Sequence, residues 1–140
     1  MSSLTGAIII AAKAHLGQVD KGGNPYILHP LRVMDKVQGE EAKIVAVLHD
    51  VVEDTYVTAE DLLIIGFSKE ILTSIDCLTR KKDESYMEFI RRAKLDLIAR
   101  QVKIADIEDN MDLSRLKKVT EEDIKRNKKY EKSLKILTLD

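Results

Sequence analysis

Residues 45–55 read VAVLHDVVEDT, an apolar helical segment that four ionisable side chains interrupt. His49 and Glu53 are four residues apart in this segment. Asp50 and Asp54 repeat the same spacing, so a helix places the four side chains on neighbouring faces as one polar wall. An ionisable group without a partner costs several kcal/mol to bury. The segment must therefore face water or a shared cation, and this choice decides between a surface helix and an active site.

Helical periodicity and helix-ending residues recur along the chain, so the sequence predicts an all-α fold. Gly17 and Gly66 supply helix stops, and His29-Pro30 is typical of a first helical turn. No stretch alternates as a strand would, and no repeat or linker divides the chain, so we expect a single domain over residues 1–140. We expect helices in residues 4–18, from 29 onward, and in 39–54, 58–66, 68–79, 83–94, 95–111 and 120–138, the last one amphipathic.

Composition narrows the setting in which such a domain works. The chain of 140 residues is 44% hydrophobic, which suits one domain with one core. Its 23 Lys and Arg residues nearly balance its 24 Asp and Glu residues, so no overall basic field favours nucleic acid or a membrane as a partner. The single Cys77 cannot form an internal disulfide and fits a reducing compartment. No leader-like N-terminus or apolar run of ~18 residues occurs, so we expect a soluble, cytoplasmic protein.

A second polar wall follows the apolar start of VKIADIEDNMDL, residues 102–113, where Asp106 and Asn110 are four residues apart. His29 lies at a predicted helix start, from which its ring can join both walls. Two imidazoles and two carboxylates then form a mixed nitrogen and oxygen set that suits a divalent metal such as Mn²⁺, Fe²⁺ or Zn²⁺. A His-Asp pair on its own is more typical of an exposed helix, and only the whole constellation favours a metal site. Its members are His29, His49, Asp50 and Asp106.

Three ordered motifs, AHLGQVDKGGNPYILHP, VLHDVVEDT and VKIADIEDNM, resemble the hydrolase domain of the RelA/SpoT family within the HD-domain superfamily. The resemblance runs from about Ala14 to Leu116 and includes the pattern HD-x-x-ED. It implies an HD-type helical bundle, and the short chain resembles the family's stand-alone hydrolases, which lack synthetase and regulatory domains. The residues that match the family's metal ligands, which typically hold Mn²⁺, are His29, His49, Asp50 and Asp106.

The same resemblance implies a reaction and further site residues. Family members remove pyrophosphate from the 3′ position of guanosine tetraphosphate or pentaphosphate, the nucleotides of the stringent response. Glu53 and Asp54 match the acidic pair that positions or deprotonates the attacking water, a role that suits carboxylates beside a cation. Asn110 matches a residue that lines the ribose and phosphate side of the nucleotide. Lys21, in a flexible loop, is a predicted phosphate contact. The candidate metal ligands and the resemblance together predict a metal-dependent hydrolase of a small nucleotide.

Several positions depart from the family pattern and bear on the substrate. Many members carry an Arg-Lys pair in the loop before the HP motif, with the arginine stacked on the base, whereas here the pair is Asp20-Lys21. The frequent family sequence ADRLHNM is replaced by ADIEDNM, which puts Ile107 in place of a basic residue and Asp109 in place of a histidine. Asp112 adds another negative charge. We therefore expect a site without the base clamp and less positive than is usual in the family.

Other functions remain open at this point. Some animal stand-alone relatives attack the 2′-phosphate of a nicotinamide dinucleotide such as NADPH, so another phosphorylated nucleotide is the second hypothesis. A nucleotide-binding regulator without turnover is the third, although a pure binder has little need of Glu53 and Asp54. Three histidines do not readily furnish two iron sites, which argues against a di-iron oxygenase. The basic residues of the last helix are expected to form a solvated face, and the sequence leaves the oligomeric state open.

Overall fold

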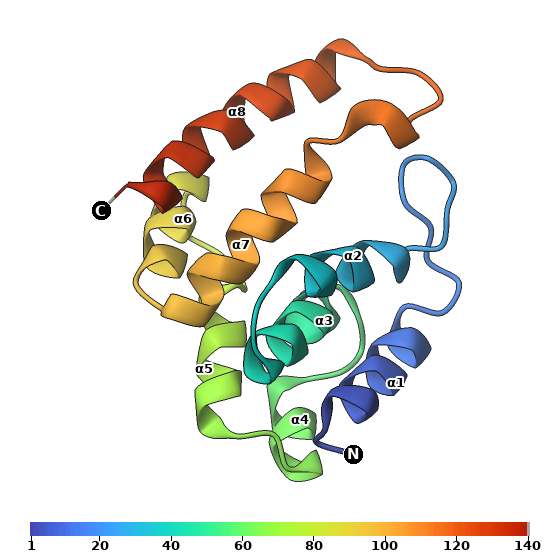
Figure 1. Cartoon of the computed structure of the whole chain (residues 1–140), viewed down its shortest axis with the longest axis vertical. Helices are drawn as coiled ribbons and strands as arrows, with labels where there is room; N and C mark the ends of the chain where they lie inside the picture. The colour runs from blue at the N-terminus through green and yellow to red at the C-terminus, as the bar shows by residue number, and fades with distance from the viewer. Residues whose placement is uncertain (140) are drawn as a thin grey trace.

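A computed structural model describes residues 1–139, which form eight α-helices and one short 3-10 helix and contain no β-strand (Figure 1). The prediction of an all-α fold is confirmed, and each segment predicted to be helical contains a helix. The elements are α1 (Leu4–Ala14), α2 (Leu28–Lys36), α3 (Glu40–Asp54), α4 (Ala59–Ile65), α5 (Lys69–Cys77), α6 (Tyr86–Lys94), α7 (Leu97–Asn110), η1 (Leu113–Arg115) and α8 (Glu121–Thr138).

Side-chain caps fix the ends of several helices. Thr58 and Asp61 form a capping box at the start of α4, in which each side chain accepts a hydrogen bond from the other residue's backbone N–H. Thr120 and Asp123 form the same device at the start of α8. Gly66 ends α4 with φ of 117°, a left-handed conformation that favours glycine. These ends lie where the sequence predicted them.

Helix α3 runs through the middle of the molecule and packs against α1, α2, α5 and α7. Every residue from Ile44 to His49 is buried, as expected for a helix that other helices surround. The apolar residues of α3 join those of α1, α2, α4, α5 and α7 in the main core. His49 and Asp50 therefore lie on the helix at the centre of the fold.

In residues 1–139, each helix is too short or too polar to cross a membrane.

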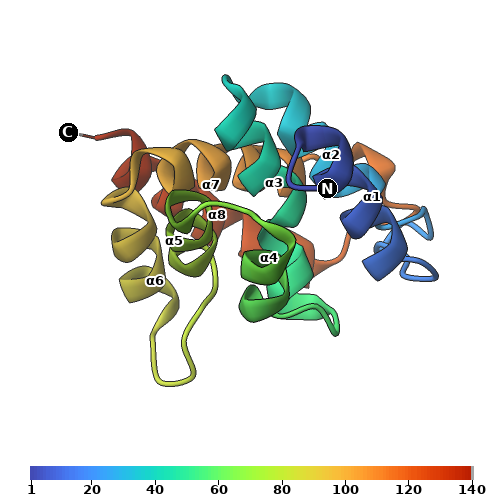
Figure 2. The same ribbon diagram turned by 90° about the horizontal axis from the view of Figure 1, so that it is seen from below.

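A second, smaller apolar cluster joins α6, α7 and α8 through Ile90, Ile107 and Leu137. Helix α7 contributes to both clusters, because Val102 belongs to the main core. Figure 2 shows α6, α7 and α8 grouped on one side of α3, with α1 and α2 on the other. The last helix is thus attached to the rest of the molecule through α6 and α7.

The loop between α1 and α2 is held by its own side chains and by a distant segment. Asp20 Oδ1 accepts hydrogen bonds from the backbone N–H groups of Gly22 and Asn24, both at 2.9 Å. A Cβ at Gly22 would lie 2.6 Å from the carbonyl oxygen of Arg115, so only glycine allows this approach. The loop therefore packs against η1, although about two thirds of the chain separates them in sequence, and it carries Lys21 to the same place.

Candidate metal centre

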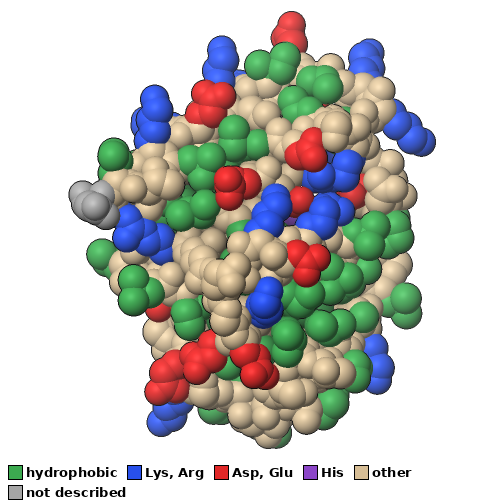
Figure 3. Space-filling model, in the orientation of Figure 1, with side chains coloured by type: hydrophobic (Ala, Val, Ile, Leu, Met, Phe, Trp, Pro, Cys, Tyr) green, Lys and Arg blue, Asp and Glu red, His purple; other side chains and the backbone are tan. Residues whose placement is uncertain are grey.

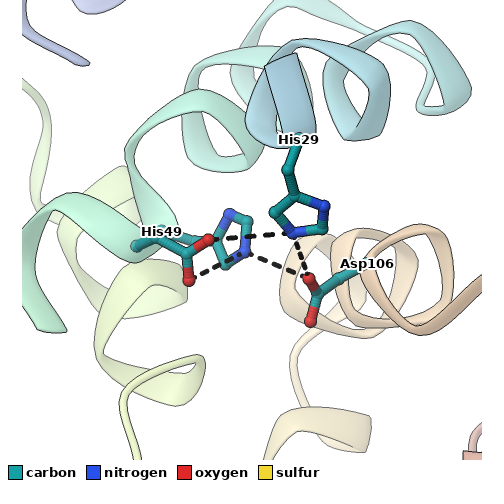
Figure 4. A group of neighbouring side chains, drawn as sticks. His29, His49 and Asp106 are labelled. Carbon is teal, nitrogen blue, oxygen red and sulfur yellow. Dashed lines mark hydrogen bonds and ion pairs between the residues drawn. The ribbon is translucent and has the colours of Figure 1, made fainter. Parts of the chain in front are cut away.

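Three helices bring the four predicted metal ligands together. His29 comes from the first turn of α2, His49 and Asp50 from α3, and Asp106 from α7. One candidate ligand atom from each residue lies within 4.8 Å of the others. Figure 4 shows that the two rings and the Asp106 carboxylate point toward one another. The structure thus brings together polar residues from both of the walls that helical spacing indicated.

The distances within this cluster are those of ligands around a small central space. His29 Nε2 lies 2.8 Å from Asp106 Oδ1 and 3.8 Å from Asp50 Oδ2. His49 Nε2 lies 3.3 Å from Asp50 Oδ1 and 3.5 Å from Asp106 Oδ1. Asp50 is fixed from outside the cluster, because the Tyr26 hydroxyl donates a 2.6 Å hydrogen bond to its Oδ2. The Asp50 carboxylate is therefore held in place by a residue outside the cluster.

The state of the His49 ring tests whether the cluster fits a cation. His49 Nδ1 is bound to the backbone carbonyl of Ala46 at 2.6 Å, which leaves Nε2 to face the cluster. This Nε2 is buried and has no hydrogen-bond partner. Buried polar atoms nearly always have one, so an unpaired nitrogen beside carboxylates fits a metal ligand. Two ring nitrogens and two carboxylates could hold a divalent metal ion such as Mn²⁺, Fe²⁺ or Zn²⁺.

The carboxylates control the charge of the two rings. Burial alone lowers the pKa of His29, but hydrogen bonds to Asp106 and Asp109 outweigh it and raise the pKa to about 10. Burial likewise opposes a charge on His49, and the nearby Asp50 and Asp106 raise its pKa nonetheless. Burial works against ionisation of Asp106, yet Lys103 and the two rings hold its pKa well below the usual range. The cluster is thus built to attract positive charge.

Two cavities adjoin this cluster. The inner cavity, of about 230 Å³, is lined by the four candidate ligands. The outer cavity, of about 430 Å³, extends toward η1 and α8. Tyr26, His29 and Asn110 line both cavities, so the two cavities meet at these side chains. Asn110 also donates a 3.3 Å hydrogen bond to Asp106 Oδ1, which ties the shared wall to the cluster.

The predicted acidic pair lies at the C-terminal end of α3. Glu53 lines the inner cavity, whereas Asp54 is not among its lining residues. Burial, with the negative charges of Asp54 and Asp50, raises the pKa of Glu53. Burial and Asp50 raise the pKa of Asp54 as well. Of the pair, Glu53 is the one placed to act on a molecule in the cavity.

Lys103 is a buried cation beside the cluster that sequence reasoning did not select. Its Nζ lies 3.0 Å from Asp106 Oδ2 and 4.9 Å from the centre of the Phe89 ring. Burial opposes its charge, but Asp106 and Tyr86 outweigh this effect and raise the pKa of Lys103. The inner cavity therefore contains a permanent positive charge close to the candidate ligands, joined on its rim by Arg80.

Basic side chains also line the outer cavity. Lys21 lies there as predicted, with Nζ 4.0 Å from Asp123 Oδ1. Arg126 and Tyr130 of α8 are further lining residues, so the last helix is not only the solvated face that the sequence predicted. Figure 3 shows basic side chains, interleaved with acidic ones, near the middle of this face. The other basic lining residues are Arg32 and Arg115.

Two of the family departures occupy different places relative to the cavities. Ile107 is fully buried in the second apolar cluster and lines neither cavity. Asp109 is only 2% exposed, and it is bound by His29, Arg32 and Arg115. Its hydrogen bonds with His29 and Arg32 outweigh its burial and lower its pKa. Asp109 thus offsets the positive charge of two arginines that line the outer cavity, and the less positive site stays a prediction.

The chain is similar in sequence to parts of several longer proteins. No protein-family model matches the chain. The chain is 33% identical over 123 residues to a GTP pyrophosphokinase from Myxococcus xanthus. It is 41% identical over 85 residues to a guanosine-3′,5′-bis(diphosphate) 3′-pyrophosphohydrolase from Borreliella burgdorferi. These alignments cover 75% and 58% of this chain but 16% and 13% of the relatives, so the chain spans about one sixth of their length or less.

A solved structure of a metazoan orthologue of SpoT is similar over 99% of this chain and 86% of the other, with a TM-score of 0.78 and 24% identity. The chain therefore shares the fold of that protein. Its His and Asp cluster could hold a divalent metal ion. In sequence the chain is similar to RelA/SpoT-type proteins, as its three ordered motifs predicted.

Proposed function

We propose that the chain is a metal-dependent phosphohydrolase that removes pyrophosphate from the 3′ position of guanosine tetraphosphate or pentaphosphate. The observation that carries this proposal is the cluster of His and Asp side chains beside two cavities whose walls carry both basic and acidic residues. The proposal draws its substrate from the relatives, of which several are named guanosine-3′,5′-bis(diphosphate) 3′-pyrophosphohydrolase.

The proposed cation is Mn²⁺, and the proposed ligands are His29 Nε2, His49 Nε2 and carboxylate oxygens of Asp50 and Asp106. When bound, it would polarise the phosphoryl group and make a neighbouring water more acidic. The unpaired Nε2 of His49 supports this assignment, because a cation would satisfy that buried atom. Tyr26 would keep Asp50 in place through its hydrogen bond.

Glu53 is the proposed proton acceptor, with Asp54 as the second member of the acidic pair. The water oxygen would bond to the phosphorus attached to the 3′ oxygen, and the bond between that phosphorus and the 3′ oxygen would break. The water proton would pass to Glu53 and from there, directly or through solvent, to the 3′ oxygen, which would leave as a hydroxyl group. A raised pKa suits Glu53 to this role, because general bases work best with a pKa near the operating pH.

The outer cavity is the proposed nucleotide-binding part of the site. Asn110 lies where the two cavities meet and would contact the ribose and phosphate side of the nucleotide. Lys21 and Arg126 would bind phosphate groups, since both line the outer cavity and carry fixed positive charge. Lys103 would balance negative charge at the inner end. A cytoplasmic setting and a role in the stringent response complete the proposal.

A nucleotide panel tests this function. The full chain is incubated with Mn²⁺ and guanosine tetraphosphate, guanosine pentaphosphate or NADPH, and the release of pyrophosphate and phosphate is measured separately. We expect pyrophosphate and guanosine 5′-diphosphate from the tetraphosphate, and loss of this activity with a chelator. If phosphate is released from NADPH faster than pyrophosphate is released from guanosine tetraphosphate, NADPH takes the place of the proposed substrate. Tight binding of the tetraphosphate without any product would instead support a regulator.

A further inference from the structure

The ring of His29 has two nitrogens that face different partners. Nε2 points into the cluster toward Asp106. Nδ1 points away from the cluster, and Asp109 Oδ2 lies 2.6 Å from it. A carboxylate bound to the outer nitrogen of a histidine fixes the orientation and tautomer of the ring, so that the inner nitrogen presents its lone pair to a metal. Asp109 is therefore in position to determine how His29 faces the cation site.

The carboxylate of Asp109 is itself fixed. Arg32 grips it with two hydrogen bonds, from Nε to Oδ1 at 2.8 Å and from Nη2 to Oδ2 at 3.1 Å. Arg115 Nη2 donates to the backbone carbonyl of Asp109 at 2.8 Å and lies 3.4 Å from Oδ2. A planar guanidinium that binds both carboxylate oxygens restricts their rotation. Because Asp109 is buried, this arrangement leaves its oxygens one orientation toward His29.

His49 shows that the outer nitrogen of the second ring is fixed by other means. There the backbone carbonyl of Ala46, one turn earlier in α3, takes the place of a carboxylate. This contact follows from the helix itself and survives any substitution at position 46 that keeps the helix. The corresponding contact of His29 depends on a side chain of α7, 80 residues away in the sequence. A single substitution can therefore release one ring and leave the other in place.

We infer that Asp109 is a positioning residue for the cation site, which it serves by holding the His29 ring while Arg32 holds Asp109. The inference rests on the proposed metal ligands, and it assigns a role to a residue that sequence reasoning treated only as an added negative charge. Removing the Asp109 charge should weaken the cation site without removing any ligand. Carboxylates in this position typically account for 10- to 100-fold in metal affinity.

The test is calorimetric titration of MnCl₂ into the metal-free full chain and its variants, with thermal unfolding of the metal-free forms measured in parallel. Asp109→Asn keeps the size of the side chain, and we expect Mn²⁺ affinity to fall about 10- to 100-fold. Arg32→Gln keeps the Asp109 carboxylate but removes the guanidinium that binds it, and we expect a smaller loss of Mn²⁺ affinity than in Asp109→Asn. This second variant keeps the test decisive if Asp109→Asn fails to fold.

Glu84→Gln is the matched control. The Glu84 carboxylate is bound by Arg92 Nε at 2.7 Å and Nη2 at 2.9 Å, so the variant breaks the same kind of ion pair at a carboxylate with no histidine among its hydrogen-bond partners. We expect its Mn²⁺ affinity to equal that of the parent. If Asp109→Asn and Arg32→Gln lower only the unfolding temperature, as Glu84→Gln does, Asp109 is a structural ion-pair residue and the inference is wrong, while the proposed function stands. If the parent binds no Mn²⁺, both fall.

Discussion

The inner cavity is lined mainly by helices α2, α3, α6 and α7, whereas the outer cavity is closed by the loop of residues 19–25, by η1 and by α8. The candidate metal ligands at the inner cavity are buried or half-buried, with His49 only 3% exposed. The outer cations are partly exposed, and the side chain of Lys21 is 60% exposed. Charges out of contact with water interact more strongly and are screened less by salt. Single substitutions should therefore have larger effects at the inner end than at the outer end.

The largest expected effect is at the cluster itself. His49→Ala removes a proposed ligand whose buried Nε2 lacks a hydrogen-bond partner, so we expect Mn²⁺ binding and turnover both to disappear. Calorimetry and pyrophosphate release measure the two losses. His15→Ala is the matched control, because His15 is also buried and bound to a side chain, that of Gln18, but lies outside the cluster. Full metal occupancy in His49→Ala would rule out the site.

An intermediate effect is expected at the rim of the inner cavity. Glu53→Gln removes the proposed proton acceptor, and we expect kcat to fall by ~10² to 10⁴ with Mn²⁺ affinity nearly unchanged. Asp54→Asn should cost less, because Asp54 does not line the cavity. Steady-state kinetics at saturating Mn²⁺ separates the two variants, with Glu60→Gln on α4 as an exposed control. Parental rates in both would show that the acidic pair is structural and would favour a regulator.

The smallest effect is expected at the outer end. Arg126→Gln removes a partly exposed cation of α8, and we expect KM for guanosine tetraphosphate to rise about tenfold, equivalent to about 1.4 kcal/mol, while kcat stays the same. The difference should shrink at higher salt. Lys132→Gln is the control on the same helix, since Lys132 is exposed and lines neither cavity. A fall in kcat at constant KM would contradict the division between the two ends.

The candidate ligands at the inner end could be predicted because they lie at helical spacing within apolar segments. Asp50 and Asp106 each follow an apolar run whose period defines a buried face, so the sequence indicates which side of each helix carries polar groups. The prolyl residue after His29 marks the helix start that brings its ring to the same place. Family motifs then specified the grouping of these residues. Local periodicity and short motifs therefore indicated the four candidate ligands, but they did not indicate Lys103 of the same cavity.

The outer end could not be predicted in the same way, because its residues meet only through tertiary packing. Arg126 belongs to a helix rich in charge, and its sequence gives no sign that one basic side chain faces a cavity. Asp20 looked like the loss of a base clamp, yet it is also the residue that holds the loop through two backbone N–H groups. Asp109 looked like an added charge until its partners were visible. A count of charged residues does not predict the electrostatic potential of a cavity when burial and ion pairing determine it.

The two separate apolar clusters imply that the walls of the two cavities belong to regions of unequal stability. Helix α8 contributes Leu137 to the small cluster with Ile90 and Ile107, whereas α3 is surrounded by the main core. Regions that bury little apolar surface open locally at a lower free energy than the whole molecule unfolds. We expect amide hydrogens of α8 to exchange with solvent well before those of α3. Product could then leave as the wall formed by α8 opens, while the residues around His49 keep their arrangement.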